Sequence, residues 1–309
     1  MSRFLLGRLG IGILVVWGVV TAVFIIVRLA PGDQATVALG PEATQEEIDS
    51  LRHQMGLDRP VWQQYIAYLG GVLRLDFGES YRYGRPAMDA VIERFPATVV
   101  LTVAATVIAV VFGILLGVLA GRRPGGAADR VVSAVALVMQ AIPPFWAGIM
   151  FILVFALTLR LLPSAGAGSP LHLVLPAITL AIPFTALVAR ITRSSVVEVM
   201  GEGFVQSARA KGLSERQVLF GHVVKNALIP VITVIALQVG TLLGGAVIVE
   251  TVFAWPGLGS LLVGAVGNRD YAVVQAATVL IAVCVVVLTL VADVTYARLD
   301  PRIRLAARR

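Results

Sequence analysis

Charge is scarce in this sequence. Asp, Glu, Lys and Arg make up 14% of the 309 residues, against about 25% in ordinary soluble domains, whereas 58% of the residues are hydrophobic. A soluble protein of this length has too little interior to bury so much apolar surface. The composition therefore excludes a soluble globular domain and predicts a chain that uses the lipid bilayer as its solvent.

Cysteine and histidine are scarce too, which excludes several kinds of site. Cys284 is the single cysteine, so the chain cannot form an intramolecular disulfide. His53, His172 and His222 lie far apart, without a cysteine neighbour or a second histidine at ligand spacing, so no metal site is expected. The sequence also lacks a P-loop, a His-Glu-x-x-His helix and a Gly-x-Ser-x-Gly elbow, and we expect no catalytic residues.

The sequence contains six long windows without a charged residue. Each is near or above the ~20 residues that a helix needs to cross roughly 30 Å of hydrocarbon. We therefore predict an all-α protein with six transmembrane helices. The first is expected to be a retained anchor, because it is longer than the roughly 7–15-residue apolar core of a signal peptide. The six windows are Leu9 to Val27, Phe95 to Gly121, Val131 to Leu159, Leu161 to Ala189, Asn226 to Val249 and Tyr271 to Ala292.

The net charge of +7 is distributed unevenly along the chain. If the N-terminus is cytoplasmic, the basic clusters at 122–130, 190–225 and 298–309 all lie in the cytoplasm, and the short external loops keep only Arg160 and Arg269. This is the positive-inside pattern of a multi-pass protein of the cell membrane, with both termini cytoplasmic. It accounts for the basic excess without a nucleic-acid partner.

Capping and proline signals predict further details. Thr44-Gln-Glu-Glu47 is a capping box that opens a short external helix ending near Gly56, and Pro60 opens a second helix. That second helix carries Trp62, Ile66, Leu69 and Leu73 at helical spacing. A third helical stretch leads through Pro96 into the second span. Pro143 and Pro144 should break the third span, and Pro176 and Pro183 should bend the fourth, which should begin near Leu171.

The stretch "QSARAKGLSERQVLFGHVVKNALIP", residues 206–230, is polar and basic between two apolar spans. Residues 203–211 predict a short helix, Gly212 its left-handed stop, and Ser214 to Gln217 a capping box that starts a second helix leading into the fifth span. A basic loop that touches only anionic lipid would explain the charge. Two capped helices fix a shape, however, and lipid binding needs no fixed shape.

This stretch resembles the cytoplasmic loop of binding-protein-dependent ABC importer permeases. The consensus of that loop is Glu-Ala-Ala, three residues, Gly, then Ile-x-Leu-Pro. This chain has Gln206-Ser207-Ala208 in place of Glu-Ala-Ala and a longer gap to Pro230, and the dipeptide/oligopeptide branch makes the same departures. "ARAKGLS" followed by "NALIP" is accordingly similar to that branch. Further segments resemble the same branch in collinear order, and the external segment resembles that of its B-type chain. These segments are "GLDRPVWQQYIAYL" (56–69), "DFGES" (76–80), "FPATVVLT" (95–102), "VETVFAWPGLGSLL" (249–262), "RDYAVVQ" (269–275) and "DVTYARLDPRIR" (293–304).

The resemblance implies a type I importer permease fold, in which a crosswise coupling helix on the cytoplasmic side docks into an ATPase subunit. It divides the chain into a first transmembrane helix (1–30), an external segment (31–97), a five-helix permease core (98–297) with the coupling loop at 191–228, and a cytoplasmic tail (298–309). The ATPase-coupling residues it implies are Gln206, Ala208, Arg209, Ala210, Lys211, Gly212 and Leu213.

The resemblance also implies a non-catalytic permease subunit of a peptide importer. Its partners would be a homologous second permease, one or two P-loop ATPase subunits that carry ATP and Mg²⁺, and an extracellular solute-binding protein. The chain itself would hold no cofactor. Docking candidates for the binding protein are Trp62, Tyr65 and Trp255, although tryptophan at this depth is also common in the interfacial belt. Pathway candidates are Gln238 and Thr241 on the fifth span.

Two alternatives remain open at this point. The same machinery could import haem or a nickel or other metal chelate, because the binding protein largely selects the substrate. An ion-coupled secondary transporter is the rival class, but such proteins place ionisable residues at mid-membrane and show internal repeats, and neither feature is visible in the sequence. A gated channel is excluded only by the resemblance.

Overall fold

The computed structural model describes residues 2–29, 34–40 and 42–299. These form two compact units. One comprises Ser2–Thr98 and Pro256–Val286, and the other comprises Val99–Trp255 and residues 287–299. The expected core, 98–297, does not coincide with one unit, because residues 256–286 group with the N-terminal part. Most of the expected tail, from residue 300 on, lies outside the described residues.

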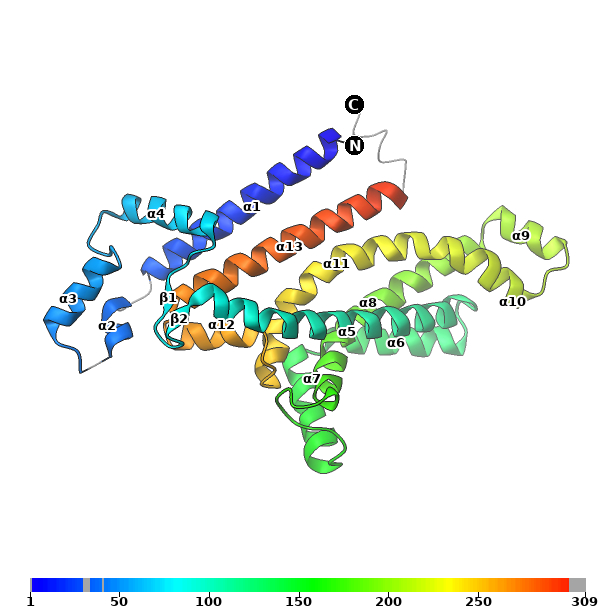
Figure 1. Cartoon of the computed structure of the whole chain (residues 1–309). Coiled ribbons are helices and arrows are strands. Elements are labelled where there is room, and N and C mark those ends of the chain that lie inside the picture. The colour runs from blue at the N-terminus through cyan, green and yellow to red at the C-terminus, as the bar shows by residue number, and fades with distance from the viewer. Residues whose placement is uncertain (1, 30–33, 41, 300–309) are drawn as a thin grey trace. The chain divides into compact units, whose positions relative to one another are not determined.

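The first unit consists of helices and one very short hairpin (Figure 1). In chain order its elements are α1 (Ser2–Leu29), α2 (Gln34–Leu39), α3 (Gln45–Gln54), α4 (Val61–Arg74), β1 (Glu79–Ser80), β2 (Arg85–Pro86), the start of α5 (Ala87–Gly121), α12 (Leu258–Gly267) and the start of α13 (Tyr271–Leu299).

The short helices between the first two spans follow their predicted caps. Thr44 and Glu47 form the expected capping box at the start of α3, with the Thr44 amide donating to Glu47 Oε2 at 2.8 Å. Helix α4 follows Pro60 directly and rests on α1, where the Tyr65 and Thr21 hydroxyls are 2.7 Å apart and the Phe24 ring lies 5.2 Å from that of Tyr65. The segment between the first two spans is therefore anchored to the first span through α4.

The hairpin β1–β2 was not expected from the sequence. Its two antiparallel strands pair Glu79 with Pro86 and Ser80 with Arg85. The Ser80 hydroxyl donates to Asp270, a buried carboxylate that also accepts from the Val273 amide in the first turn of α13. Two segments that resemble the peptide branch, "DFGES" and "RDYAVVQ", thus meet 190 residues apart in sequence.

The second unit is built around α8 (Val174–Met200), which packs against α6 (Ala127–Ala141), α7 (Pro144–Phe151) and α11 (Val224–Val252). It also contains the rest of α5, the π-helix η1 (Ile152–Thr158), the 3-10 helix η2 (Pro170–Leu173), α9 (Gly203–Ala210), α10 (Glu215–Val218) and the π-helix η3 (Leu219–Val223).

Helix α5 approaches α8 closely along a row of glycines. Gly113, Gly117 and Gly121 recur once per turn, and a Cβ atom added to each would collide with the side chain of Val188, Thr192 and Val196 respectively. Small residues at this spacing let two membrane helices pack backbone against backbone.

Of the six predicted spans, five correspond to described helices that are each long and apolar enough to cross a membrane. The third window differs, because it forms two helices, Ala127–Ala141 and Pro144–Thr158, bent by 100°. The break falls at the predicted prolines: Pro143 and Pro144 lack an amide hydrogen, and a residue before proline disfavours helical backbone. The bent pair is the sixth span if both halves cross together. The fourth span begins at Pro170, close to the expected Leu171, and α8 runs as one helix across Pro176 and Pro183.

Candidate functional site

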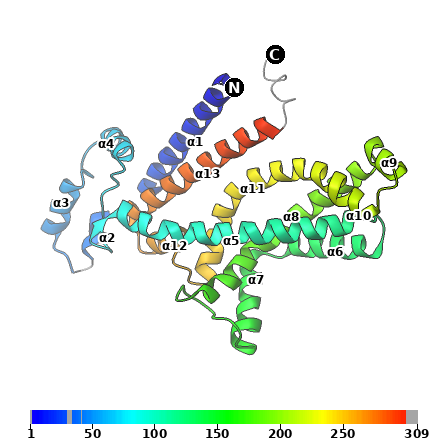
Figure 2. The same ribbon diagram turned by 45° about the vertical axis from the view of Figure 1, so that its right-hand side comes forward.

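The candidate site is the turn between α8 and α11, formed by α9, residues 211–214 and α10. We refer to residues 203–218 as the elbow. Both views place the elbow at the end of its unit where α5 also finishes (Figures 1 and 2). The elbow is followed by η3 and then by α11 without an intervening loop.

A defined stop separates the two helices of the elbow. Gly212 has a φ of +79°, in the left-handed region that glycine adopts without a steric penalty. Its amide donates to Arg209 O at 2.9 Å, and the Leu213 amide donates to Ala208 O at 3.4 Å. These two bonds form a Schellman motif, which satisfies carbonyls at the end of α9.

The second helix of the elbow begins immediately after this stop. The Ser214 amide donates to Gln217 Oε1 at 3.0 Å, and the Gln217 amide donates to Ser214 Oγ at 3.4 Å. This is the capping box that the sequence predicts. The predicted sequence of helix, glycine stop and capped helix is therefore confirmed.

One face of α9 is buried inside the chain. Val205 and Ala208 belong to a cluster of buried side chains that joins the end of α8 to the start of α11, and Ala208 is 7% exposed. Its small side chain allows α9 to lie close to its own neighbours and leaves little surface for a partner. The other members of this cluster are Val196, Val218, Val223 and Ala227.

An ion pair closes the elbow on its exposed side. Arg209 Nε donates to Glu215 Oε1 at 2.9 Å and Nη2 donates to Glu215 Oε2 at 3.2 Å, across the Gly212 stop. The family resemblance implies that Arg209 contacts a partner, whereas in the structure Arg209 is paired within its own chain. A bidentate pair fixes the angle between α9 and α10 more than it stabilises the fold, because exposed pairs are worth only about 0–1 kcal/mol.

The remaining expected coupling residues lie on the exposed side of the elbow. Gln206, Ala210, Lys211, Gly212 and Leu213 are all exposed and follow one another around the outside of the turn. The structure thus divides the seven sequence candidates into an exposed group of five, one residue in an internal ion pair and one buried residue.

The other sequence candidates are scattered. Gln238 and Thr241 do lie together on α11, but the Thr241 hydroxyl donates to Gln238 O at 2.7 Å. Trp62 is 63% exposed, while Tyr65 is half-buried against α1 and Trp255 is only 6% exposed. Trp255 is thus buried, whereas Trp62 is the most exposed of the three docking candidates.

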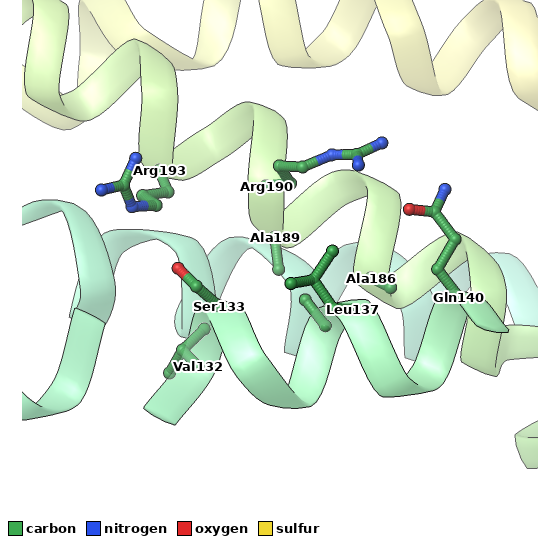
Figure 3. A pocket seen from close by; sticks show the side chains of 9 residues that line it. Val132, Ser133, Leu137, Gln140, Ala186, Ala189, Arg190 and Arg193 are labelled. Atoms are coloured by element: carbon green, nitrogen blue, oxygen red, sulfur yellow. The ribbon is translucent and has the colours of Figure 1, made fainter. Parts of the chain in front are cut away.

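A hollow of about 200 Å³ lies between α6 and α8 (Figure 3). Arg190 and Gln140 extend along its rim, and Arg193 lies at its other end. Arg193 Nη2 donates to Asp129 Oδ2 at 2.8 Å, and Asp129, whose side chain is 6% exposed, also accepts from the Gly125 amide at 2.8 Å. Nothing in the sequence indicates this pair, because its members are 64 residues apart and have no local spacing rule.

Solved structures share the fold. The inward-facing MetNI methionine ABC transporter is 21% identical, with a TM-score of 0.58 over 69% of this chain and 97% of that one. An amino acid ABC transporter solved with histidines is 16% identical, with a TM-score of 0.54 over 68% and 94% of the two chains. These likenesses confirm the type I importer permease fold.

Closer relatives cover nearly the whole chain. A probable peptide ABC transporter permease of Sinorhizobium fredii is 39% identical over 98% of this chain and 100% of its own length. A glutathione transport system permease of Escherichia coli is 41% identical over 91% and 92%. A di/tripeptide transport system permease of Pseudomonas aeruginosa is 39% identical over 98% and 99%.

Two family matches cover most of the sequence. Residues 1–102 match the N-terminal part of the membrane component of binding-protein-dependent transport systems. Residues 113–305 match the main part of that component. Together with the apolar helices and the elbow, these matches show that this multi-pass membrane chain belongs to the family of binding-protein-dependent transport system inner membrane components, the permease subunits of ABC importers.

Proposed function

We propose that this chain is the B-type permease subunit of an ATP-driven importer for di- and oligopeptides. With a homologous second permease it encloses the pathway across the membrane. The substrate class is supported by the relatives of Sinorhizobium fredii and Pseudomonas aeruginosa, whose names specify peptides, and by the glutathione permease, since glutathione is itself a tripeptide.

The elbow is the observation that carries the proposal. A force applied to α9 reaches the membrane helices only if α9 does not bend or slide. Three features oppose such motion: the Schellman stop at Gly212, the capping box at Ser214 and the buried cluster that ties Val205 to α8 and α11. A basic loop that served only to bind lipid would need none of them.

The elbow docks on one of two separate ATPase subunits, which bind ATP and Mg²⁺. The contact surface is the exposed group Gln206, Ala210, Lys211, Gly212 and Leu213. Arg209 holds the two helices of the elbow together through Glu215, and Ala208 sets the close approach of α9 to its own core. Lys211 carries the only formal charge of the exposed group and pairs with an acidic or carbonyl group of the ATPase.

The remaining assignments follow from this orientation. The elbow and both termini are cytoplasmic, in agreement with the positive-inside pattern. The external segment faces an extracellular solute-binding protein, with the exposed Trp62 on α4 as its docking residue. Tyr65 holds α4 on α1 through Thr21 and takes no direct part in docking.

Purification from the native membrane and reconstitution test this proposal. The chain should co-purify with a second permease and one or two P-loop ATPases, and the assembled complex with its binding protein should import labelled dipeptides only when ATP is present. Uptake driven by an ion gradient without ATP would contradict the proposal and favour a secondary transporter. Uptake of haem or a metal chelate but not of peptides would contradict the substrate class alone.

A further inference from the structure

A second, larger hollow lies behind the elbow, and the proposed function does not use it. Its volume is about 390 Å³. A single water molecule needs only roughly 10–15 Å³ of free space, so this hollow accommodates a substantial chemical group. We call it the basic pocket; it is lined by Arg122, Arg123, Met200, Arg209, Glu215, Arg216, Val218, Leu219, Phe220 and Val223.

The basic pocket has an excess of unpaired positive charge. Four arginines and one glutamate line it, and the glutamate is already bonded to Arg209. Within the part of the chain that the structure describes, Arg122, Arg123 and Arg216 have no acidic partner. Three free guanidinium groups around one hollow favour an anion, and guanidinium matches the geometry of phosphate oxygens.

The other wall of the pocket is apolar and continues into a membrane span. Phe220 is 60% exposed although it lies near the start of the apolar stretch Glu215–Val252. Leu219 is half-buried beside it. A ligand that fills this pocket therefore meets positive charge on one side and exposed hydrocarbon on the other.

These two walls suit one occupant better than others. A free anion would use the arginines and leave Phe220 in contact with water. An acidic side chain of a protein partner would do the same. A phospholipid places its phosphate and its acyl chains at these two depths, and basic pockets at the cytoplasmic ends of membrane helices bind such headgroups.

We propose that the basic pocket binds the headgroup of an anionic phospholipid of the cytoplasmic leaflet, with Arg122, Arg123 and Arg216 as ligands of its phosphate. Arg122 and Arg123 directly follow α5, and Arg216 belongs to α10. A bound headgroup therefore links the end of α5 to the elbow. In this way the lipid joins the end of α5 to α10, which the arginine side chains of the pocket do not join by themselves.

Lipid binding by the purified full chain in nanodiscs tests the proposal. Native mass spectrometry should show phosphatidylglycerol retained in preference to phosphatidylcholine, and rising salt should weaken the retention. The triple variant R122Q/R123Q/R216Q should retain phosphatidylglycerol at least about tenfold less well, because it removes the three guanidinium groups that line the same pocket and would bind one phosphate together. The variant R130Q/R190Q/K225Q removes the same charge outside the pocket and should behave as the wild-type chain.

Three results would overturn the proposal. Equal losses in both triple variants would mean that lipid responds only to total charge. Displacement of phosphatidylglycerol by inorganic phosphate would assign the pocket to a soluble anion. Unchanged lipid retention together with failure of R122Q/R123Q/R216Q to co-purify with the ATPases would assign the pocket to an acidic group of the partner. If the triple variant does not fold, R216Q alone and the salt dependence of the wild-type chain decide the question. The lipid-retention readouts depend neither on peptide transport nor on the ATPases, so they can fail while the proposed function holds, and the reverse.

Discussion

Gly117 should tolerate no side chain at all. A Cβ atom at this position would lie 2.6 Å from the carbonyl oxygen of Ala189 on α8, about 0.8 Å closer than the 3.4 Å at which ordinary contact begins. The obstacle is backbone, so no rotamer change relieves it, and α5 must move away from α8. Such a movement also loosens the packing at Gly113 and Gly121, one turn away on either side.

The G117A substitution should therefore destabilise the folded chain, although alanine has a higher helix propensity than glycine. Alanine in place of glycine favours a helix by about 1 kcal/mol, whereas overpacking a close interface costs roughly 1–3 kcal/mol. We expect the collision to dominate, and the difference lowers the free energy of unfolding by up to about 2 kcal/mol. At roughly 2–4 °C per kcal/mol, the Tm should fall by up to about 8 °C.

Thermal unfolding of the detergent-purified chain, followed by circular dichroism, measures this effect. The matched control is G244A on α11, where an added Cβ atom meets nothing within 4 Å. That control should leave the Tm unchanged or raise it. A Tm for G117A equal to that of G244A would refute the close packing of α5 on α8.

Three further predictions concern the elbow, the Arg193–Asp129 ion pair and the Ser80–Asp270 hydrogen bond. G212P should abolish ATP-dependent peptide uptake in reconstituted vesicles while membrane insertion stays normal, because proline cannot adopt a φ of +79° or donate a hydrogen bond to the end of α9. The control G212N should keep most of the uptake, because asparagine tolerates this conformation. Uptake by G212P would argue against a rigid elbow. R193A should lower the free energy of unfolding by roughly 1–3 kcal/mol in denaturant titrations, because the buried Asp129 carboxylate loses two hydrogen-bond donors. An unchanged midpoint would show that the hydrogen bonds from Gly125 and Ser133 are enough to stabilise Asp129. S80A should make the β1–β2 hairpin more sensitive to limited proteolysis, because its hydrogen bond to Asp270 is lost. An unaltered digestion pattern would show that the backbone pairing and the bond from the Tyr81 hydroxyl to the Asn268 carbonyl hold the hairpin without it.

Local signals in the sequence were sufficient for the spans and the elbow. A window of about 20 uncharged residues has one stable arrangement in lipid, since only a helix satisfies its backbone internally. The caps at Thr44 and Ser214 and the stop at Gly212 each depend on residues within five positions of one another. The same holds for the break at Pro143, whose missing amide acts wherever the chain lies.

The function could be inferred from the sequence because the motifs that indicate it occur in a fixed order along the chain. The external segment, the elbow and the later motifs appear in the order of the permease family, and family matches covering residues 1–102 and 113–305 confirmed that resemblance. The individual roles within the elbow could not be predicted in the same way. A helix of eight residues presents every side chain to some surface, and the sequence does not say which surface is the chain's own core.

Tertiary structure alone decided which residues remain accessible and which ones pair. The fold buries the Ala208 side chain against α8 and α11 and buries most of the Trp255 side chain. It also joined Arg209 to Glu215 and Arg193 to Asp129. The physical reason is the same in each case: a cap or a span is fixed by neighbours along the chain, whereas burial and ion pairing depend on which helices pack together, and that is settled only when the whole chain has folded.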